Sequence, residues 1–124
     1  MKRGFTMIEF VMVIAILGIL AATALPRFVN LSTIAQENAA KGTLGSIRAA
    51  VMIAYASNAA YGSQMPPSTI EADMFHDRLI PNEPYSASNA VILVTQVPSG
   101  TGVGWAYSSS DGRVWINNSQ YTGY

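Results

Sequence analysis

The chain has 124 residues, half of them hydrophobic and only 11% charged, and its formal net charge at pH 7 is zero. This length suits one small domain, and the surplus of apolar residues gathers near the N-terminus. Nucleic-acid binding is disfavoured because there is no basic patch, and the absence of cysteine excludes a disulfide framework and thiolate metal sites.

The first four residues are a short basic leader in which Lys2 and Arg3 precede Gly4. An apolar run follows over residues 5–25. As a helix it would be about 31 Å long, which matches the hydrocarbon core of a bilayer. The positive-inside rule predicts that the leader lies in the cytoplasm and that everything after residue 25 lies outside.

Glu9 is the acidic residue inside this apolar run. A carboxylate at membrane depth costs about 2.5 to 3.5 kcal/mol on insertion scales, so we expect it to have a partner. If the chain were cut after Gly4, a new amine would appear on Phe5 and could serve as the counter-charge. The alternative is an acid that is merely tolerated near a helix end, protonated or reaching toward the interface.

A kink is predicted near the end of the apolar run. Pro26 removes one backbone hydrogen bond and clashes with the preceding turn, and Gly18 further loosens the helix. The pattern favours neither an ordinary kink of a membrane helix nor a kink that serves a function in assembly.

Helical periodicity resumes over residues 26–61. The apolar positions on one face of its later part are Leu44, Ile47, Val51, Ala54 and Tyr55. Gly62 is a natural C-terminal cap. The whole helix, from residue 5 to residue 61, would be about 85 Å long, and a domain of this size cannot bury such a rod.

The remaining residues, 62–124, are predicted to form a small head. Ser68 and Glu71 match a capping box that opens a short helix, which Pro81 would end. Apolar and β-branched runs predict strands at residues 90–97, 103–108 and 113–118, with a turn at 110–112. An antiparallel sheet of these strands, packed on the C-terminal half of the kinked helix, predicts an α+β fold.

Metal binding and catalysis find little support. His76 has Asp73 and Asp77 nearby, but a single histidine on a short polar helix is more often a surface residue. Asp111 could suggest a calcium ligand, yet an Asp-Gly pair is better explained as turn chemistry. No cofactor, metal or enzymatic activity is predicted, since there is no phosphate loop and no cluster of ligands.

The start of the chain carries a family resemblance. The motif Gly4-Phe5-Thr6-Met7-Ile8-Glu9 resembles the processing site of type IV prepilins and type II secretion pseudopilins. The likeness continues through residues 16–22 and 24–28, although Met7 stands where the family usually has leucine. Residues 24–32 are most similar to pilins of the mannose-sensitive haemagglutinin type.

The resemblance implies a pilin fold with a leader at 1–4, a transmembrane and filament-core helix at 5–25, a second helix half at 26–61 and a head at 62–124. It implies that a prepilin peptidase cuts after Gly4 and methylates the new Phe5 amine. Glu9 would then contact the Phe5 amine of an adjacent subunit during assembly, while residues 18–26 can unwind as subunits pack.

The same resemblance implies the partners and the location. The precursor would be a single-pass protein in the lipid of the bacterial inner membrane, with its C-terminus in the periplasm. An assembly platform in that membrane would draw it into a helical polymer of its own copies, and the pilus or pseudopilus would lie at the cell surface or in the periplasm.

Two alternatives remain open: a pseudopilin that forms a short periplasmic piston, and a secreted soluble ligand-binding domain released after Ala24 by an ordinary signal peptidase. Adhesion, motility and electron transfer are all open as roles. Electron transfer would rest on a track of aromatic side chains. The alternative is that these side chains only pack against lipid and neighbouring helices. The members of the track are Phe5, Phe10, Phe28, Tyr55 and Tyr61.

Overall fold

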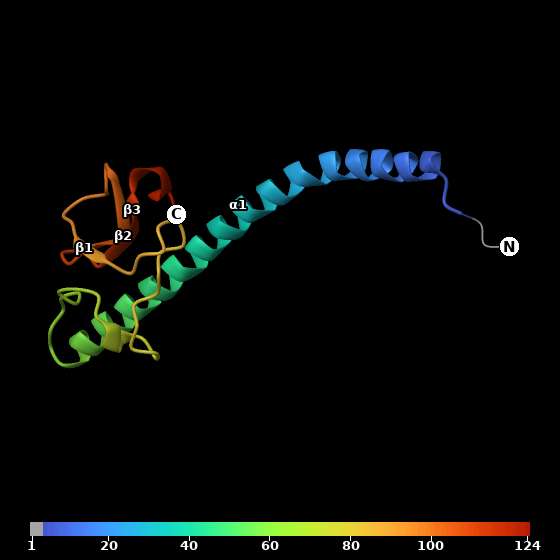
Figure 1. The fold of residues 1–124 in the computed structure, drawn as a ribbon. Coiled ribbons are helices and arrows are strands. Elements are labelled where there is room, and N and C mark those ends of the chain that lie inside the picture. The colour runs from blue at the N-terminus through green and yellow to red at the C-terminus, as the bar shows by residue number, and fades with distance from the viewer. Residues whose placement is uncertain (1–3) are drawn as a thin grey trace. The chain divides into compact units, whose positions relative to one another are not determined.

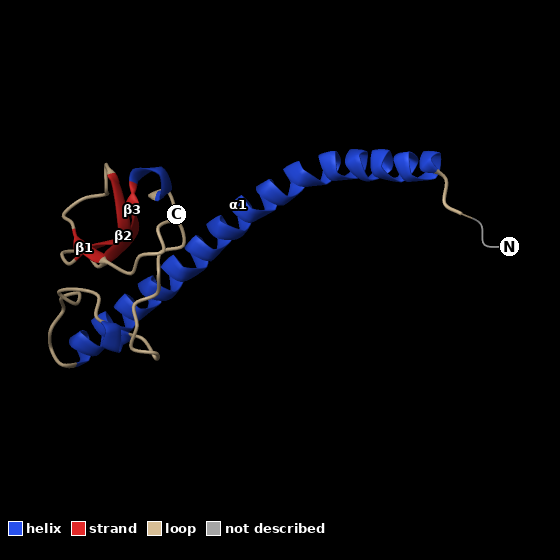
Figure 2. Ribbon diagram, in the orientation of Figure 1, coloured by secondary structure: helices blue, strands red, loops and turns tan. Residues whose placement is uncertain are grey.

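A computed structural model describes residues 4–124, with the backbone alone for residues 26–30. The elements along the chain are α1 (Met7–Ala60), η1 (Ala72–Met74), β1 (Val91–Leu93), β2 (Thr101–Ser108), β3 (Arg113–Asn118) and η2 (Ser119–Tyr121) (Figures 1 and 2). The chain divides into two compact units, of which the second comprises Gln36–Tyr124. The predicted α+β fold is confirmed.

The long helix of the prediction is α1, and its observed bounds lie within two residues of those expected. The backbone is helical at both Gly18 and Pro26. The side chain of Pro26 lies outside the described residues, so the kink stays a prediction.

Gly62 ends α1, as predicted. Its φ of 89° is in the left-handed region, which glycine adopts without strain. The amide of Gly62 donates to the carbonyl of Ala59 at 3.1 Å, and the amide of Ser63 donates to the carbonyl of Asn58 at 2.9 Å. These two bonds form a Schellman motif, which satisfies carbonyls that the helix end would otherwise leave unpaired.

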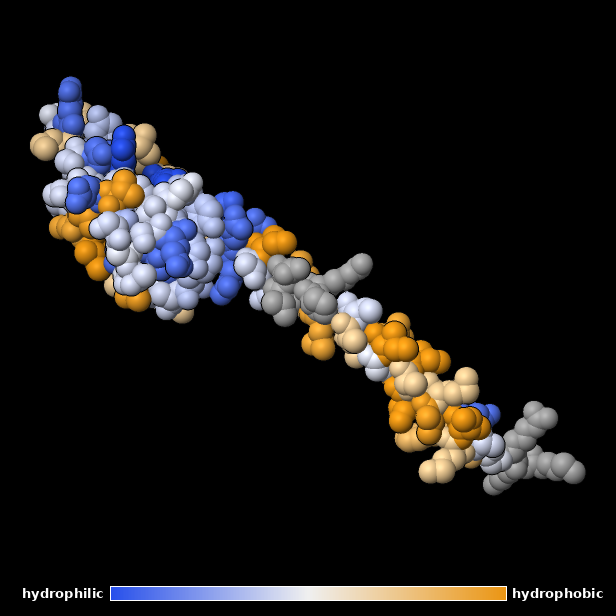
Figure 3. Space-filling view, turned by 90° about the horizontal axis from the view of Figure 1, so that it is seen from above, coloured by the Kyte–Doolittle hydropathy of each residue, from blue (hydrophilic) through white to orange (hydrophobic). Residues whose placement is uncertain are grey.

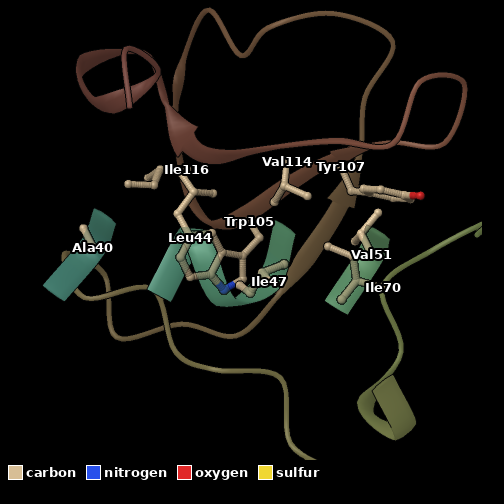
Figure 4. Packing of buried hydrophobic residues seen from close by; sticks show 9 residues of the cluster. All are labelled: Ala40, Leu44, Ile47, Val51, Ile70, Trp105, Tyr107, Val114 and Ile116. Carbon is tan, nitrogen blue, oxygen red and sulfur yellow. The ribbon is translucent and has the colours of Figure 1, made fainter. Parts of the chain in front are cut away.

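The core of the second unit lies between α1 and one face of the sheet (Figure 4). From the predicted apolar face of the helix, Leu44, Ile47 and Val51 are buried, and they pack against Trp105 and Tyr107 of β2. The other members of the cluster are Ala40, Ile70, Val114 and Ile116. Helical periodicity therefore predicted correctly which face of α1 meets the sheet.

The sheet is mixed rather than antiparallel. The strand order is β1-β2-β3, in which β2 and β3 are antiparallel but β1 runs parallel to β2, with Ile92 opposite Ala106. Residues 94–104 intervene between the paired segments, a connection slightly shorter than the dozen or so residues that usually join a parallel pair. Gly104 makes the return possible, since its φ is 74° and a Cβ there would lie 2.3 Å from the carbonyl oxygen of Ala90.

Strand bounds differ accordingly. The first predicted strand, 90–97, shrinks to Val91–Leu93, the second begins two residues early at Thr101, and Arg113–Asn118 is as predicted. The predicted turn at 110–112 is present, with the amide of Gly112 donating to the carbonyl of Ser108 at 2.8 Å.

The predicted capping-box helix after Ser68 is wrong. Only η1, a single turn of 3-10 helix, forms, and the side chain of Glu71 makes no capping hydrogen bond to it. Tertiary contacts hold the preceding segment in place, because Ile70 is 3% exposed and the carbonyl of Pro67 accepts the hydroxyl of Tyr107 at 2.6 Å.

Candidate functional site

The first turns of α1 present apolar side chains to the outside. The segment Met7–Leu25 has a mean hydropathy of 2.5, none of it is buried within the structure, and it is long and apolar enough to cross a membrane. Figure 3 shows apolar side chains along this part of the helix. Such a surface is stable in water only if lipid or another protein covers it.

Glu9 lies in the first turn of α1 and forms a capping box with Thr6. Its Oε2 accepts the backbone N–H of Thr6 at 2.8 Å and the Thr6 hydroxyl at 2.9 Å. In return the backbone N–H of Glu9 donates a hydrogen bond to Thr6 Oγ1 at 3.4 Å. The carboxylate therefore satisfies donors at the helix start, where the macrodipole also favours negative charge.

The predicted scissile pair precedes this capping box. Gly4 and Phe5 are outside the helix and exposed, and the side chain of Phe5 is 72% exposed. A cut between them would create an amine on Phe5, one residue before the amide that Glu9 already holds. Within one chain Glu9 therefore binds the residue that follows Phe5, and its contact with the Phe5 amine of an adjacent subunit stays a prediction.

The other predicted sites lie apart from this one. Gly18 lies within the exposed apolar segment of α1, with open space where a side chain would be. His76, Asp73 and Asp77 are exposed, and the described residues contain no group of three or more metal-ligating side chains.

Asp111 serves the β2–β3 turn. Its carboxylate accepts the amide of Arg113 at 3.3 Å and pairs with the Arg113 guanidinium at 3.2 Å. The hydroxyl of Ser108 is the main cause that lowers the pKa of Asp111. These local contacts agree with turn chemistry rather than with a metal ligand.

Aromatic contacts occur elsewhere than in the predicted track. In the described part of the chain, Tyr85 stacks on Tyr121 with ring centroids 3.8 Å apart, and Tyr121 lies 6.4 Å from Tyr124. Of the predicted members, Phe10 is 58% and Tyr61 90% exposed, and the side chain of Phe28 lies outside the described residues.

These tyrosines belong to a cluster of side chains that the sequence did not predict. We call this cluster the tyrosine latch, and its members are Lys41, Arg48, Tyr85, Tyr121 and Tyr124. Arg48 donates to the carbonyl oxygens of Tyr124 at 2.8 Å and Val114 at 3.1 Å. The ammonium of Lys41 lies 4.7 Å from the ring centre of Tyr124. The latch fixes the last residues on α1 in a chain that has no disulfide.

A buried acid, Glu83, was also missed. It is 1% exposed, and its carboxylate accepts the amides of Tyr85 and Ser86, each at 2.7 Å, and the hydroxyl of Ser86. Ser86 Oγ in turn accepts the amide of Gly104 at 3.1 Å. Glu83 thus anchors the loop before β1 to β2.

Comparison with known proteins points to one family. Residues 1–25 match the family described as the prokaryotic N-terminal methylation motif. The type IV narrow pilus major component PilA5 of Thermus thermophilus is 46% identical over 52 residues, which cover 42% of this chain and 45% of the relative. No solved structure matches the chain significantly.

Two further relatives match most of the chain. The type IV major pilin PilE1 of Neisseria gonorrhoeae is 32% identical over 107 residues, covering 81% of this chain and 61% of the relative. The fimbrial protein EcpC of Eikenella corrodens is 30% identical over 102 residues, covering 82% and 66%. The chain therefore spans less than two thirds of the length of each relative named here.

An exposed apolar helix that begins with a Thr-Glu capping box, joined to a small head, defines a pilin-like protein. With the motif match and these relatives, the chain belongs to the type IV pilin superfamily. The relatives are structural pilins, in agreement with the prediction that this chain is not an enzyme. The narrower likeness to mannose-sensitive haemagglutinin-type pilins stays a prediction.

Proposed function

We propose that the chain is the precursor of a structural subunit of a type IV pilus. The observation that carries the proposal is the capping box of Thr6 and Glu9 at the start of an exposed apolar helix, directly after Gly4 and Phe5. This arrangement gives one carboxylate, one cleavable bond and one long surface that needs cover.

The first step is processing. The leader holds the chain in the inner membrane with its basic residues in the cytoplasm. Prepilin peptidase cuts after Gly4, where glycine and the exposed, non-helical backbone allow entry into a peptidase site. The new amine on Phe5 is then methylated.

The second step is assembly from the membrane, driven by the platform. Copies of the segment Met7–Leu25 cover one another in the filament, and burial of their exposed apolar surface supplies about 25 cal/mol per Å2. The filament core excludes water, so an unpaired carboxylate there is strongly disfavoured.

Glu9 sets the register of assembly. Before cleavage, Thr6 supplies the hydrogen bonds to its carboxylate. After cleavage, the Phe5 ammonium of an adjacent subunit supplies the positive charge that those neutral donors lack. A subunit that docks one turn out of place leaves both charges unpaired, which penalises the wrong register.

The pseudopilin alternative shares these steps. The pilus reading is favoured because the relatives named above are pilus or fimbrial proteins by name. Fractionation after shearing separates the two, since a surface pilus is released and a periplasmic pseudopilus is not.

Mass spectrometry of the native N-terminus tests the proposal. The expected result is a chain that begins at Phe5 with a methylated amine. A chain that begins at Leu25 would contradict it and would favour the secreted soluble domain.

A further inference from the structure

Two rings of the tyrosine latch are in face-to-face contact. The rings of Tyr85 and Tyr121 are within 3° of parallel, and their centres lie 3.8 Å apart. Carbon atoms on the facing sides of the two rings are therefore in van der Waals contact. Tyr121 and Tyr124 form a looser pair, with ring centres 6.4 Å apart and an angle of 19° between the rings. Tyr85 and Tyr121 are thus the closer of the two pairs of phenols.

The backbone holds both rings of this pair in place. The amide of Tyr85 donates to the buried carboxylate of Glu83 at 2.7 Å. Tyr121 belongs to η2, whose start is fixed by Asn118 Oδ1, which accepts the amide of Gln120 at 3.0 Å. Both tyrosine side chains also pack against the core. Two groups positioned in this way react far more readily with each other than two groups that must first meet by diffusion.

The surroundings of the other tyrosines suit such a reaction less well. Tyr107 is fully buried, and its hydroxyl donates to a backbone carbonyl at 2.6 Å. Tyr61 is 90% exposed. Within the part of the chain that the structure describes, neither Tyr55 nor Tyr61 stacks on another ring. Tyr85 and Tyr121 are half-buried, so they are open to oxidation but shielded from a second molecule.

We propose that Tyr85 and Tyr121 are an oxidative cross-linking site, at which hydrogen peroxide acting through a haem peroxidase joins the two side chains. Each phenol loses one electron and one proton, and the two tyrosyl radicals form a carbon–carbon bond between the ring positions next to their hydroxyl groups. The proton on each of these carbons then moves to the phenol oxygen, which gives a dityrosine. The two electrons and two protons released reduce one hydrogen peroxide to two waters.

This cross-link joins segments that are distant in the sequence. Tyr85 precedes β1 and Tyr121 lies in η2, after β3. The chain has no cysteine with which to join them. A covalent bond between distant segments lowers the conformational entropy of the unfolded chain, so the oxidised head should be harder to unfold. The inference goes beyond the proposed pilus function and does not depend on it.

Oxidation of the full chain in detergent tests the assignment. The protein is diluted to at most one copy per micelle and treated with hydrogen peroxide and a haem peroxidase. Trypsin cuts after Arg113, which puts Tyr85 and Tyr121 in separate peptides. Mass spectrometry should find these peptides joined with the loss of two hydrogen atoms, and fragmentation should place the bond between Tyr85 and Tyr121.

Two phenylalanine variants make the test specific. Tyr121→Phe keeps the ring but cannot form a phenoxyl radical, so its yield of joined peptides should fall at least ten-fold. Tyr61→Phe, at an exposed tyrosine, is the matched control and should cross-link like wild type. Oxidised wild type should also unfold at a higher denaturant concentration than untreated wild type, and Tyr121→Phe should show no such rise.

Three results would overturn the proposal. The first is an equal yield of joined peptides in wild type and Tyr121→Phe. The second is a bond that fragmentation places between Tyr121 and Tyr124. The third is cross-linking only between chains, lost in Tyr61→Phe. None of these measurements involves filaments, so a failure of this site is distinguishable from a failure of the proposed pilus function.

Discussion

At the scale of single residues, two carboxylates do different work in this chain. Glu9 is exposed and local, held by Thr6 three residues away. Glu83 is buried and joins segments that are distant in sequence. The N-terminal motif predicted a role for the first, because its apolar surroundings are visible in the sequence. It missed the second, because Glu83 lies in an unremarkable polar loop and its burial depends on the fold.

Removing the Thr6 hydroxyl should weaken the start of α1. Thr6→Ala is expected to cost the helix about 1 kcal/mol, the usual value of an N-cap, and to speed amide exchange at residues 7–10 in detergent micelles. Thr6→Ser keeps the hydroxyl and should exchange like wild type. Equal exchange in all three chains would show that the capping box does not stabilise the helix.

Removing the buried carboxylate should destabilise the head. Glu83→Ala leaves the amides of Tyr85 and Ser86 without an acceptor, and we expect a loss of about 2–4 kcal/mol in unfolding free energy. Glu83→Gln retains an acceptor and should lose less. Denaturant unfolding of the full chain in detergent, followed by the fluorescence of Trp105 and Trp115, measures both losses. A wild-type midpoint for Glu83→Ala would refute the anchoring role.

At the scale of elements, local sequence patterns predicted the features that depend on residues close together in the sequence. Periodicity placed α1 and its buried face, β-branched runs placed β3, and Gly62 placed the helix end. The parallel partner of β1 and the loss of the helix after Ser68 depend on contacts between distant segments, which periodicity does not report. The tyrosine latch was not predicted for the same reason, because its residues in α1 and η2 lie far apart in the sequence.

The latch should depend on Arg48. Arg48→Ala removes both donors to the carbonyls of Val114 and Tyr124, so amide exchange at residues 119–124 should accelerate, with a loss of about 1–3 kcal/mol in stability. Arg113→Ala is the control, since its side chain is 70% exposed and should matter by less than about 0.5 kcal/mol. Equal effects of the two substitutions would argue against the latch.

The latch should also fail in alkali. Burial raises the pKa of Tyr85 above its ordinary value of 10.0 in the folded chain. The stability that the neutral Tyr85 side chain contributes is therefore complete below pH 10.0, and it is lost as the pH rises through the raised pKa of Tyr85. Tyr85→Phe cannot ionise at this position, so its stability should fall less steeply above pH 10.0. Identical slopes in denaturant titrations would contradict this.

At the scale of the whole molecule, the two units of the chain differ in how much apolar surface they leave uncovered. The second unit has its own core, while the exposed segment Met7–Leu25 has no cover within the structure. Composition and hydropathy predicted this division. A membrane before assembly, and other copies of the chain after it, can cover the segment Met7–Leu25.

The most direct test of the account is the filament yield of Glu9→Ala, with Glu71→Ala as a control at an exposed carboxylate of the head. Electron microscopy of sheared material should show normal filaments for Glu71→Ala and none for Glu9→Ala, whose processed subunits should stay in the membrane. Filaments of Glu9→Ala in wild-type number would contradict the claim that this carboxylate governs assembly.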